Sequence, residues 1–143
     1  MRIALGLGCD RGTPLDTFEQ AVTRALVEVR LRHGWADLQV VGMGSIDLKA
    51  DEIGMLALAC DRGWPLRFFT PETLAAVPVP NPSETVRRHT GTPSVSEAAA
   101  LLVAGASGPE ALLLEKLRVK GLDGRNATVS VARAEPMNPG ENA

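Results

Sequence analysis

Short apolar runs alternate along this chain with segments whose apolar residues recur at helical spacing. The runs at residues 3–7, 38–41 and 66–69 have the length of buried strands, and loops containing glycine or proline bound them. Helical spacing fills the intervals between these runs, over residues 15–29 and 53–60. Strands that alternate with helices in this way predict an α/β domain whose first strands run parallel.

The second half of the chain adds a further helix and a hairpin. Residues 94–104 carry small and apolar side chains at helical spacing, and their alanines predict a close approach to a sheet or another helix. Apolar runs at residues 111–114 and 127–132 flank the turn signal Asp123-Gly124, which predicts an antiparallel pair of strands. The whole pattern predicts a three-layer α/β/α sandwich with a mixed, mostly parallel sheet of about five strands and a C-terminal antiparallel hairpin.

Capping signals locate three expected helix starts. Thr13 is followed by proline, Asn81 is followed by proline and an acidic residue, and Ser94 and Glu97 have the spacing of a capping box. These signals are typical of well-capped structural helices. A helix start also exposes backbone N–H groups, which suit a carboxylate or a phosphate. The hydroxyl groups expected around the third start belong to Thr92, Ser94 and Ser96.

Composition excludes several classes of function. At 143 residues, the chain has the length of a single domain, which we expect over residues 1–134, with a flexible tail over residues 135–143. A net charge of −2 and an aromatic content of 3% argue against a nucleic-acid partner. No apolar run approaches the roughly 20 residues of a membrane helix. Two cysteines, Cys9 and Cys60, are too few for a disulfide scaffold and fit a reducing cytoplasm.

Neither a cofactor nor a metal is predicted. Gly6 and Gly8 match the first half of a dinucleotide-binding motif, but Arg11 stands where the third glycine belongs. No Walker sequence is present. His89 has no cysteine or carboxylate at ligand spacing, so it suggests a base or a surface residue more than a dedicated metal ligand.

The loop after the first strand contains a candidate nucleophile. Cys9 precedes Arg11 and stands close to a helix start, and both features lower the pKa of a thiol. A small residue that fills a tight turn is an equally good interpretation. Cys60 falls on the same helical face as Ile53, Leu56 and Ala57, so we expect it in the core.

Two further clusters carry charge. Lys49 and Glu52 are three residues apart and can pair on the first turn of a helix, either as a solvated ion pair or as a carboxylate-binding and proton-transferring pair. Arg87 lies in the densest basic cluster, where it is followed by Arg88 and His89. Lys116 follows an apolar run and either reaches the same edge of the sheet or lies on the hairpin surface.

Five short motifs carry a family resemblance, and they occur in the order in which that family has them. They are Gly6-Leu7-Gly8-Cys9 with Arg11-Gly12-Thr13, Ser45-Ile46-Asp47-Leu48-Lys49-Ala50-Asp51-Glu52, Pro82-Ser83-Glu84, Gly91-Thr92-Pro93-Ser94-Val95-Ser96-Glu97-Ala98-Ala99-Ala100 and Thr128-Val129-Ser130-Val131-Ala132. On these residues the chain resembles the CobE family, which is similar to the C-terminal domain of CbiG; both belong to cobalamin biosynthesis.

The resemblance runs from residue 2 to about residue 133 and implies a role in building the corrin ring. CbiG-type proteins open a ring lactone and release acetaldehyde in the cobalt-early route, whereas CobE-type proteins belong to the oxygen-dependent route. Because the chain corresponds to the C-terminal domain alone, it resembles a stand-alone CobE.

Corrin precursors carry many acetate and propionate carboxylates, which local cations and backbone N–H groups bind. The resemblance therefore implies a binding protein for a precorrin or corrinoid intermediate. The residues expected to contact this ligand are Gly8, Arg11, Ser45, Lys49, Arg87, Thr92, Ser94 and Lys116.

Two alternatives stay open. One is a CbiG-type hydrolase, with Glu52 or Glu97 as the acid/base and Cys9 or a water as the nucleophile. The other is a structural subunit that engages another enzyme of the pathway. A homodimer is compatible with each of these functions.

Overall fold

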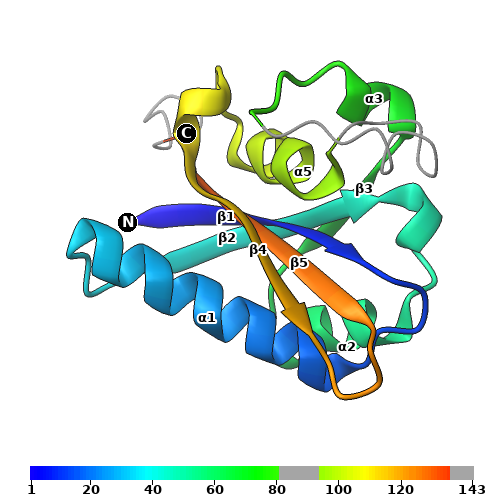
Figure 1. The fold of residues 1–143 in the computed structure, drawn as a ribbon. Helices are drawn as coiled ribbons and strands as arrows, with labels where there is room; N and C mark the ends of the chain where they lie inside the picture. Colours follow the sequence, from blue (N-terminus) through cyan, green and yellow to red (C-terminus); the bar gives the residue numbers. More distant parts are fainter. Residues whose placement is uncertain (81–93, 136–143) are drawn as a thin grey trace.

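The computed structural model of this chain describes residues 1–80 and 94–135. Its strands form one sheet in the order β3-β2-β1-β5-β4 (Figure 1). β1 pairs in parallel with β2, and β2 with β3, whereas β5 is antiparallel to both β1 and β4. Four of these five strands therefore run in one direction, which confirms the mixed, mostly parallel sheet and the C-terminal hairpin. The strands are β1 (Arg2–Cys9), β2 (Gln39–Ile46), β3 (Leu66–Phe69), β4 (Leu112–Lys120) and β5 (Asn126–Arg133).

Helices cover both faces of the sheet and complete the three layers (Figure 1). α1 packs against β4 and β5 and contacts α2, while α5 packs on the opposite face against β1, β2 and β5. The largest apolar core lies between α1, α2 and the sheet, around Phe18, Leu5 and Val129. The helices are α1 (Leu15–His33), α2 (Ile53–Arg62), α3 (Pro71–Ala75) and α5 (Val95–Ala104), with short 3₁₀ turns η1 (Asp47–Lys49) and η2 (Pro109–Ala111).

Two glycines let α5 approach the sheet closely. Gly6 of β1 and Gly44 of β2 are paired directly in the parallel register. A Cβ atom at Gly6 would lie 1.7 Å from the carbonyl oxygen of Ser96, and one at Gly44 would lie 2.8 Å from a methyl group of Val103. The absence of side chains at these two positions is therefore a requirement of packing α5 against β1 and β2.

The buried face of α2 differs from the predicted one. Ile53 is 82% exposed and Cys60 is exposed as well, so the prediction of a core cysteine is wrong. Met55 and Leu58 are buried instead. The reason is Gly54, where a Cβ atom would lie 2.4 Å from the carbonyl oxygen of Thr13, so the glycine marks the contact face.

The first helix begins later than its capping signal predicts. Pro14 precedes the first residue of α1 and has extended backbone angles, and no side chain caps this end. The hydroxyl group of Thr13 instead donates to the backbone oxygen of Asp10 at 2.8 Å. Thr13 therefore fastens the loop onto itself.

Four strands are longer than predicted: β1 and β5 by one or two residues at each end, and β2 and β4 by more. β2 continues to Ile46 because its glycines lie within the sheet and not in a loop. β4 continues to Lys120. This part was not predicted because β4 is an edge strand, whose exposed charged residues interrupt the apolar pattern. The strand at residues 66–69 was predicted with its observed limits.

The predicted helix start at Asn81 lies outside the described residues, as does the predicted tail from residue 136 onward. Glu135, which we expected in that tail, is held on both sides of its backbone: its N–H donates to the oxygen of Ala104, and its carbonyl accepts from Arg2. Within the described ranges, no helix is both long and apolar enough to cross a membrane.

Candidate functional site

The loops that follow β1 and β2 lie together at one edge of the sheet. The parallel register sets Gly6 beside Gly44, so residues 10–13 and 47–52 leave the sheet next to each other. Open α/β sheets bind their ligands at this carboxyl edge. The structure thus brings together the two loops that carried the sequence motifs.

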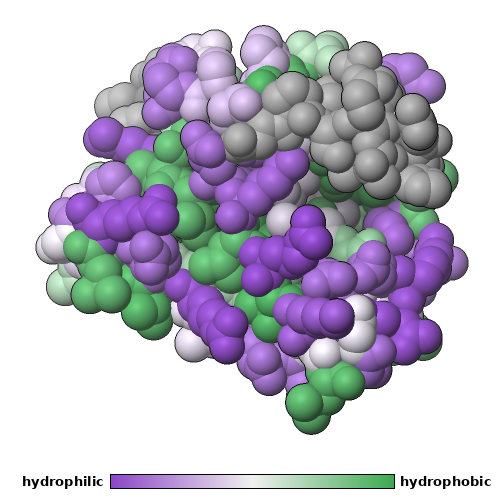
Figure 2. Space-filling model, viewed as in Figure 1, coloured by the Kyte–Doolittle hydropathy of each residue, from purple (hydrophilic) through white to green (hydrophobic). Residues whose placement is uncertain are grey.

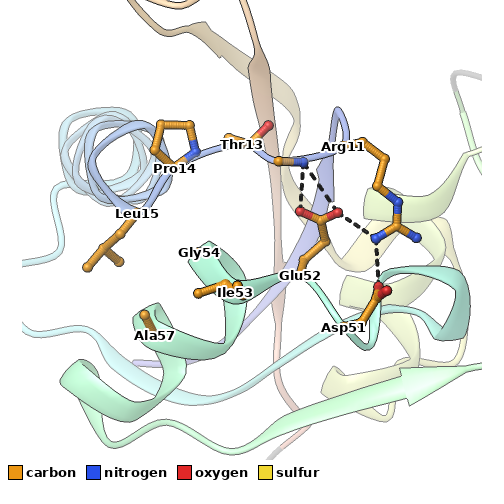
Figure 3. Close-up of a pocket in the computed structure, with 10 residues that line it drawn as sticks. Arg11, Thr13, Pro14, Leu15, Asp51, Glu52, Ile53, Gly54 and Ala57 are labelled. Atoms are coloured by element: carbon orange, nitrogen blue, oxygen red, sulfur yellow. Dashed lines mark hydrogen bonds and ion pairs between the residues drawn. The ribbon is translucent and has the colours of Figure 1, made fainter.

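Arg11 joins these two loops (Figure 3). Its Nη1 atom lies 2.6 Å from Asp51 Oδ1 and 2.7 Å from Glu52 Oε2, and its Nη2 atom donates to the backbone oxygen of Leu48 at 2.5 Å. The hydrogen bond from Arg11 lowers the pKa of Asp51, and the same bond raises the pKa of Arg11. The guanidinium group that we expected to bind a ligand is therefore already paired with two carboxylates of the protein.

Glu52 anchors the loop after β1 to the start of α2. Its side chain is 3% exposed, and the backbone N–H of Gly12 donates to Oε1 at 3.0 Å and to Oε2 at 3.4 Å. The predicted pairing of Glu52 with Lys49 is wrong in its geometry, because α2 begins only at Ile53 and Lys49 ends the separate turn η1. Both carboxylate oxygens of Glu52 are occupied by the loop itself.

Asp10 fastens the same loop to the start of β5. Its Oδ2 atom accepts from the backbone N–H of Asn126 at 2.8 Å and from its side-chain amide at 3.0 Å. Burial acts to raise the pKa of Asp10, but these two hydrogen bonds and the charges of Lys49 and Arg118 together outweigh it and lower that pKa. No local pattern predicts this contact, because the two residues lie 116 positions apart along the chain.

Cys9 has the opposite pKa shift to the predicted one. Burial raises the pKa of its thiol from 9.0 to about 12, against the opposing charges of Lys49 and Arg11. The residue packs against the apolar core on the α1 side of the sheet. This direction runs against the predicted activation of Cys9 as a nucleophile, which needs a lowered pKa.

The expected hydroxyl ligands are turned inward. Ser45 is fully buried within β2, and its hydroxyl group donates to the backbone oxygen of Leu7 at 2.7 Å. Ser94 precedes α5 as predicted, but its hydroxyl group donates to Oε1 of Glu97 at 2.9 Å and caps no backbone N–H. Glu97 is fully buried, and the hydroxyl oxygens of Ser96 and Ser130 lie 2.8 Å apart in the interior.

A hollow of about 430 Å³ opens between the starts of α1 and α2 (Figure 3). Arg11 and Glu52 form part of its polar wall, and Leu15, Ile53 and Ala57 form its apolar wall. Because the polar groups are bonded to one another, the surface that this hollow offers is mainly apolar.

Two cations near the end of β1 have no partner in the described part of the chain. Neither Lys49 nor Arg118 forms an ion pair or a side-chain hydrogen bond within residues 1–80 and 94–135, yet both interact with the charge of Asp10. Sequence reasoning missed Arg118, because only the register of the hairpin sets it opposite Thr128 and in line with Gly8.

The remaining expected ligand contacts either lie elsewhere on the sheet or fall outside the described residues. Lys116 lies on β4, where hydrophilic side chains gather over the edge of the sheet (Figure 2). Arg87, His89 and Thr92 lie outside the described residues. Within the described ranges, no three histidine, cysteine, aspartate or glutamate side chains gather closely enough to hold a metal ion.

Residues 3–132 match the family described as Cobalamin synthesis G C-terminus. The chain belongs to this CbiG C-terminal family. Its likeness to CobE of Sinorhizobium reaches 37% identity over 80% of this chain and 72% of that protein. The crystal structure of CobE, a protein from the cobalamin (vitamin B12) biosynthetic pathway, superposes with a TM-score of 0.71 and 28% identity over 94% of both chains.

The family also includes larger relatives. The cobalt-precorrin-5A hydrolase of Priestia megaterium is 35% identical over 91% of this chain, and that of Salmonella typhimurium is 34% identical over 85%. The chain spans about a third of these hydrolases, 32% of the length of each. A crystal structure of the cobalamin biosynthesis protein ChiG from Agrobacterium tumefaciens superposes with a TM-score of 0.61 and 31% identity, over 94% of this chain and 99% of that one. The resemblance read from the five motifs is confirmed, and the chain is a member of a cobalamin-biosynthesis family.

Proposed function

We propose that this CbiG C-terminal family member binds a carboxylate-rich precorrin or corrinoid intermediate of the oxygen-dependent route, at the edge where β1 and β2 end. The observation that carries this proposal is the extent of the likeness to CobE, which covers 94% of both chains in the structural superposition. The likeness to the hydrolases covers only 32% of their length. The superposition therefore extends over nearly all of that CobE chain.

The charge distribution supports a local anion site. The net charge of the chain is −2, so no general positive field attracts a polyanion. At the carboxyl edge, however, Lys49 and Arg118 have no anionic partner bonded to them among the described residues. Attraction of a carboxylate-rich ligand is then confined to one place on the surface. Arg87 and Thr92, outside the described residues, remain expected contacts.

A second candidate is hydrolysis of a precorrin lactone, which the 35% identity to a cobalt-precorrin-5A hydrolase favours. The expected catalytic groups fit this function less well than they fit structural roles. Cys9 carries a protonated thiol, Glu52 has both oxygens occupied, and Glu97 is fully buried. We therefore place binding ahead of hydrolysis.

Titration with hydrogenobyrinic acid, followed by the corrin absorbance bands, tests the binding function. We expect a saturable spectral change that weakens as salt is raised, because charge pairs carry the affinity. The heptamethyl ester of cobyrinic acid, which has no free carboxylate, is the control and should bind far more weakly. No spectral change up to high micromolar concentrations would overturn the proposal. Release of acetaldehyde from a lactone-bearing precorrin would support the hydrolase instead, and co-purification with another pathway enzyme without ligand binding would support a structural subunit.

A further inference from the structure

Among the described residues, nothing covers the α5 face of the sheet just beyond the start of that helix. α5 lies directly on Gly6, where Ser96 leaves no space for a side chain. Gly8 is two residues further along β1, about 7 Å nearer the carboxyl edge, and it points to the same face. Among the described residues, a Cβ atom at Gly8 would meet only the Cβ atom of Thr128, at an ordinary 3.8 Å.

Three residues stand in a row across the sheet at this point. Gly8 of β1 is opposite Thr128 of β5, and Thr128 is opposite Arg118 of β4. Residues directly opposite each other in an antiparallel pair share a face of the sheet. The two residues that precede Gly8 and follow Thr128 on this face, Gly6 and Ser130, are themselves paired and lie beneath α5. Gly8, Thr128 and Arg118 therefore form a floor just beyond the start of α5, across the strands β1, β5 and β4 (Figure 1).

Cations stand on both sides of this floor. Arg118 lies on the β4 side and is exposed, while half-buried Lys49 lies in the turn that follows β2. Three strand spacings of about 4.8 Å separate the backbones of β2 and β4, or about 14 Å in all. Both cations interact with the charge of Asp10, whose carboxylate already accepts two hydrogen bonds from Asn126. Neither cation forms an ion pair within the described residues, so each side chain can contact a ligand group.

We propose that Lys49 and Arg118 bind two different carboxylates of one ligand, whose flat body lies over Gly8 and Thr128. The span between the two strands suits a broad polycarboxylate, such as the rim of a tetrapyrrole. Thr128 supplies a hydroxyl group at the middle of the floor, and the missing side chain of Gly8 lets the ligand approach the backbone. The inference rests on the proposed function and names the residues that carry it.

Variants at the two cations test the inference with hydrogenobyrinic acid as the probe. We expect Lys49→Gln and Arg118→Gln each to weaken its binding by about 3- to 10-fold, the range of a partly exposed charge-assisted contact. Arg24→Gln removes an exposed arginine of α1, on the other face of the sheet, and should leave the affinity unchanged. Gly8→Val should weaken binding without unfolding, since Gly8 has an ordinary backbone conformation and, among the described residues, a new Cβ atom there would meet only Thr128.

The double variant distinguishes two carboxylates from one. If the cations bind separate carboxylates, the losses in Lys49→Gln/Arg118→Gln multiply, because independent contacts are additive in free energy. A double variant no weaker than either single variant would mean that both cations hold the same group, and it would overturn the inference. Unchanged affinity in both single variants would also overturn it while leaving the proposed function intact. Failure of the unaltered protein to bind the probe would instead remove the proposed function itself.

Discussion

A methyl group added at Gly6 would lie 1.7 Å from the carbonyl oxygen of Ser96. This single approach sets the height of α5 above the sheet, since the obstacle is backbone on both sides and cannot rotate away.

Gly6→Ala should lower the free energy of unfolding by about 3 kcal/mol or more, at the upper end of the cost of overpacking, because the helix must lift off the strand. Urea denaturation followed by circular dichroism measures this loss.

Gly8→Ala is the matched control on the same strand and the same face, with its new Cβ atom at 3.8 Å from its nearest neighbour. It should be neutral or stabilising by up to about 1 kcal/mol, as is usual when a strand glycine gains a methyl group. Equal losses in the two variants would contradict the packing role of Gly6.

Glu52→Gln should destabilise the protein, because it replaces a carboxylate that accepts from both Arg11 and the backbone of Gly12. The NH2 group of the new amide faces an N–H group of Arg11 or Gly12 and cannot accept from it. One hydrogen bond is then lost at a side chain that is only 3% exposed. We expect a loss of about 1–3 kcal/mol in the free energy of unfolding, measured by urea denaturation.

Asp51→Asn provides the comparison, because it removes the other carboxylate bound to Arg11 from a side chain that is 77% exposed. Solvent screens that pair, so its loss should be clearly smaller. A Glu52→Gln protein as stable as the unaltered one, with altered turnover, would point to catalysis and away from anchoring.

The strands, their direction and the place of α5 could be predicted from the sequence, because each rests on a local pattern. The alternation of apolar runs and the Asp123-Gly124 turn are short-range signals that tertiary packing did not override. The orientation of α2 was not predictable in this way. Its apolar residues outline one face, but Gly54 packs against the loop before α1 and turns that face to solvent.

Less of the candidate site than of the fold could be predicted from the sequence. The sequence singled out the two loops at the carboxyl edge, since parallel strands must end together. It could not show that Arg11 is already bonded to Asp51 and Glu52, or that Arg118 stands in line with Gly8. Such relationships depend on strand register and on contacts between residues about 40 or more apart, which no local pattern encodes.

Stability should fall at acid pH partly through Asp10. Its pKa is lower in the folded state than the usual value of about 3.9, so its contribution is fully present above about pH 4 and is lost as the pH falls through the folded pKa. Asp10→Asn should therefore be less stable than the unaltered protein at pH 7, and this difference should shrink steadily below pH 4. Urea denaturation at a series of pH values measures it, and a difference that stays constant with pH would contradict the role of the charge.

The two thiols should differ in reactivity by a large factor. Raising the pKa of Cys9 from 9.0 to about 12 lowers its thiolate fraction at pH 8 about 1000-fold, whereas Cys60 is exposed. In a Cys60→Ser variant, which keeps Cys9 as its one thiol, iodoacetamide at pH 8 should react very slowly until urea unfolds the chain. Cys9→Ser, which keeps Cys60, should react at the rate of a free thiol with or without urea.

The same pKa shift has a consequence for alkaline stability, and its sign follows from proton linkage. The folded pKa of Cys9 is the higher one, so the protonated thiol contributes fully below about pH 9, and this contribution is lost as the pH rises toward 12. Cys9→Ala should therefore flatten the decline in stability above pH 9. Rapid labelling of Cys9 in the folded protein would mean that the thiol is open to solvent and ionised, and would restore it as a candidate nucleophile.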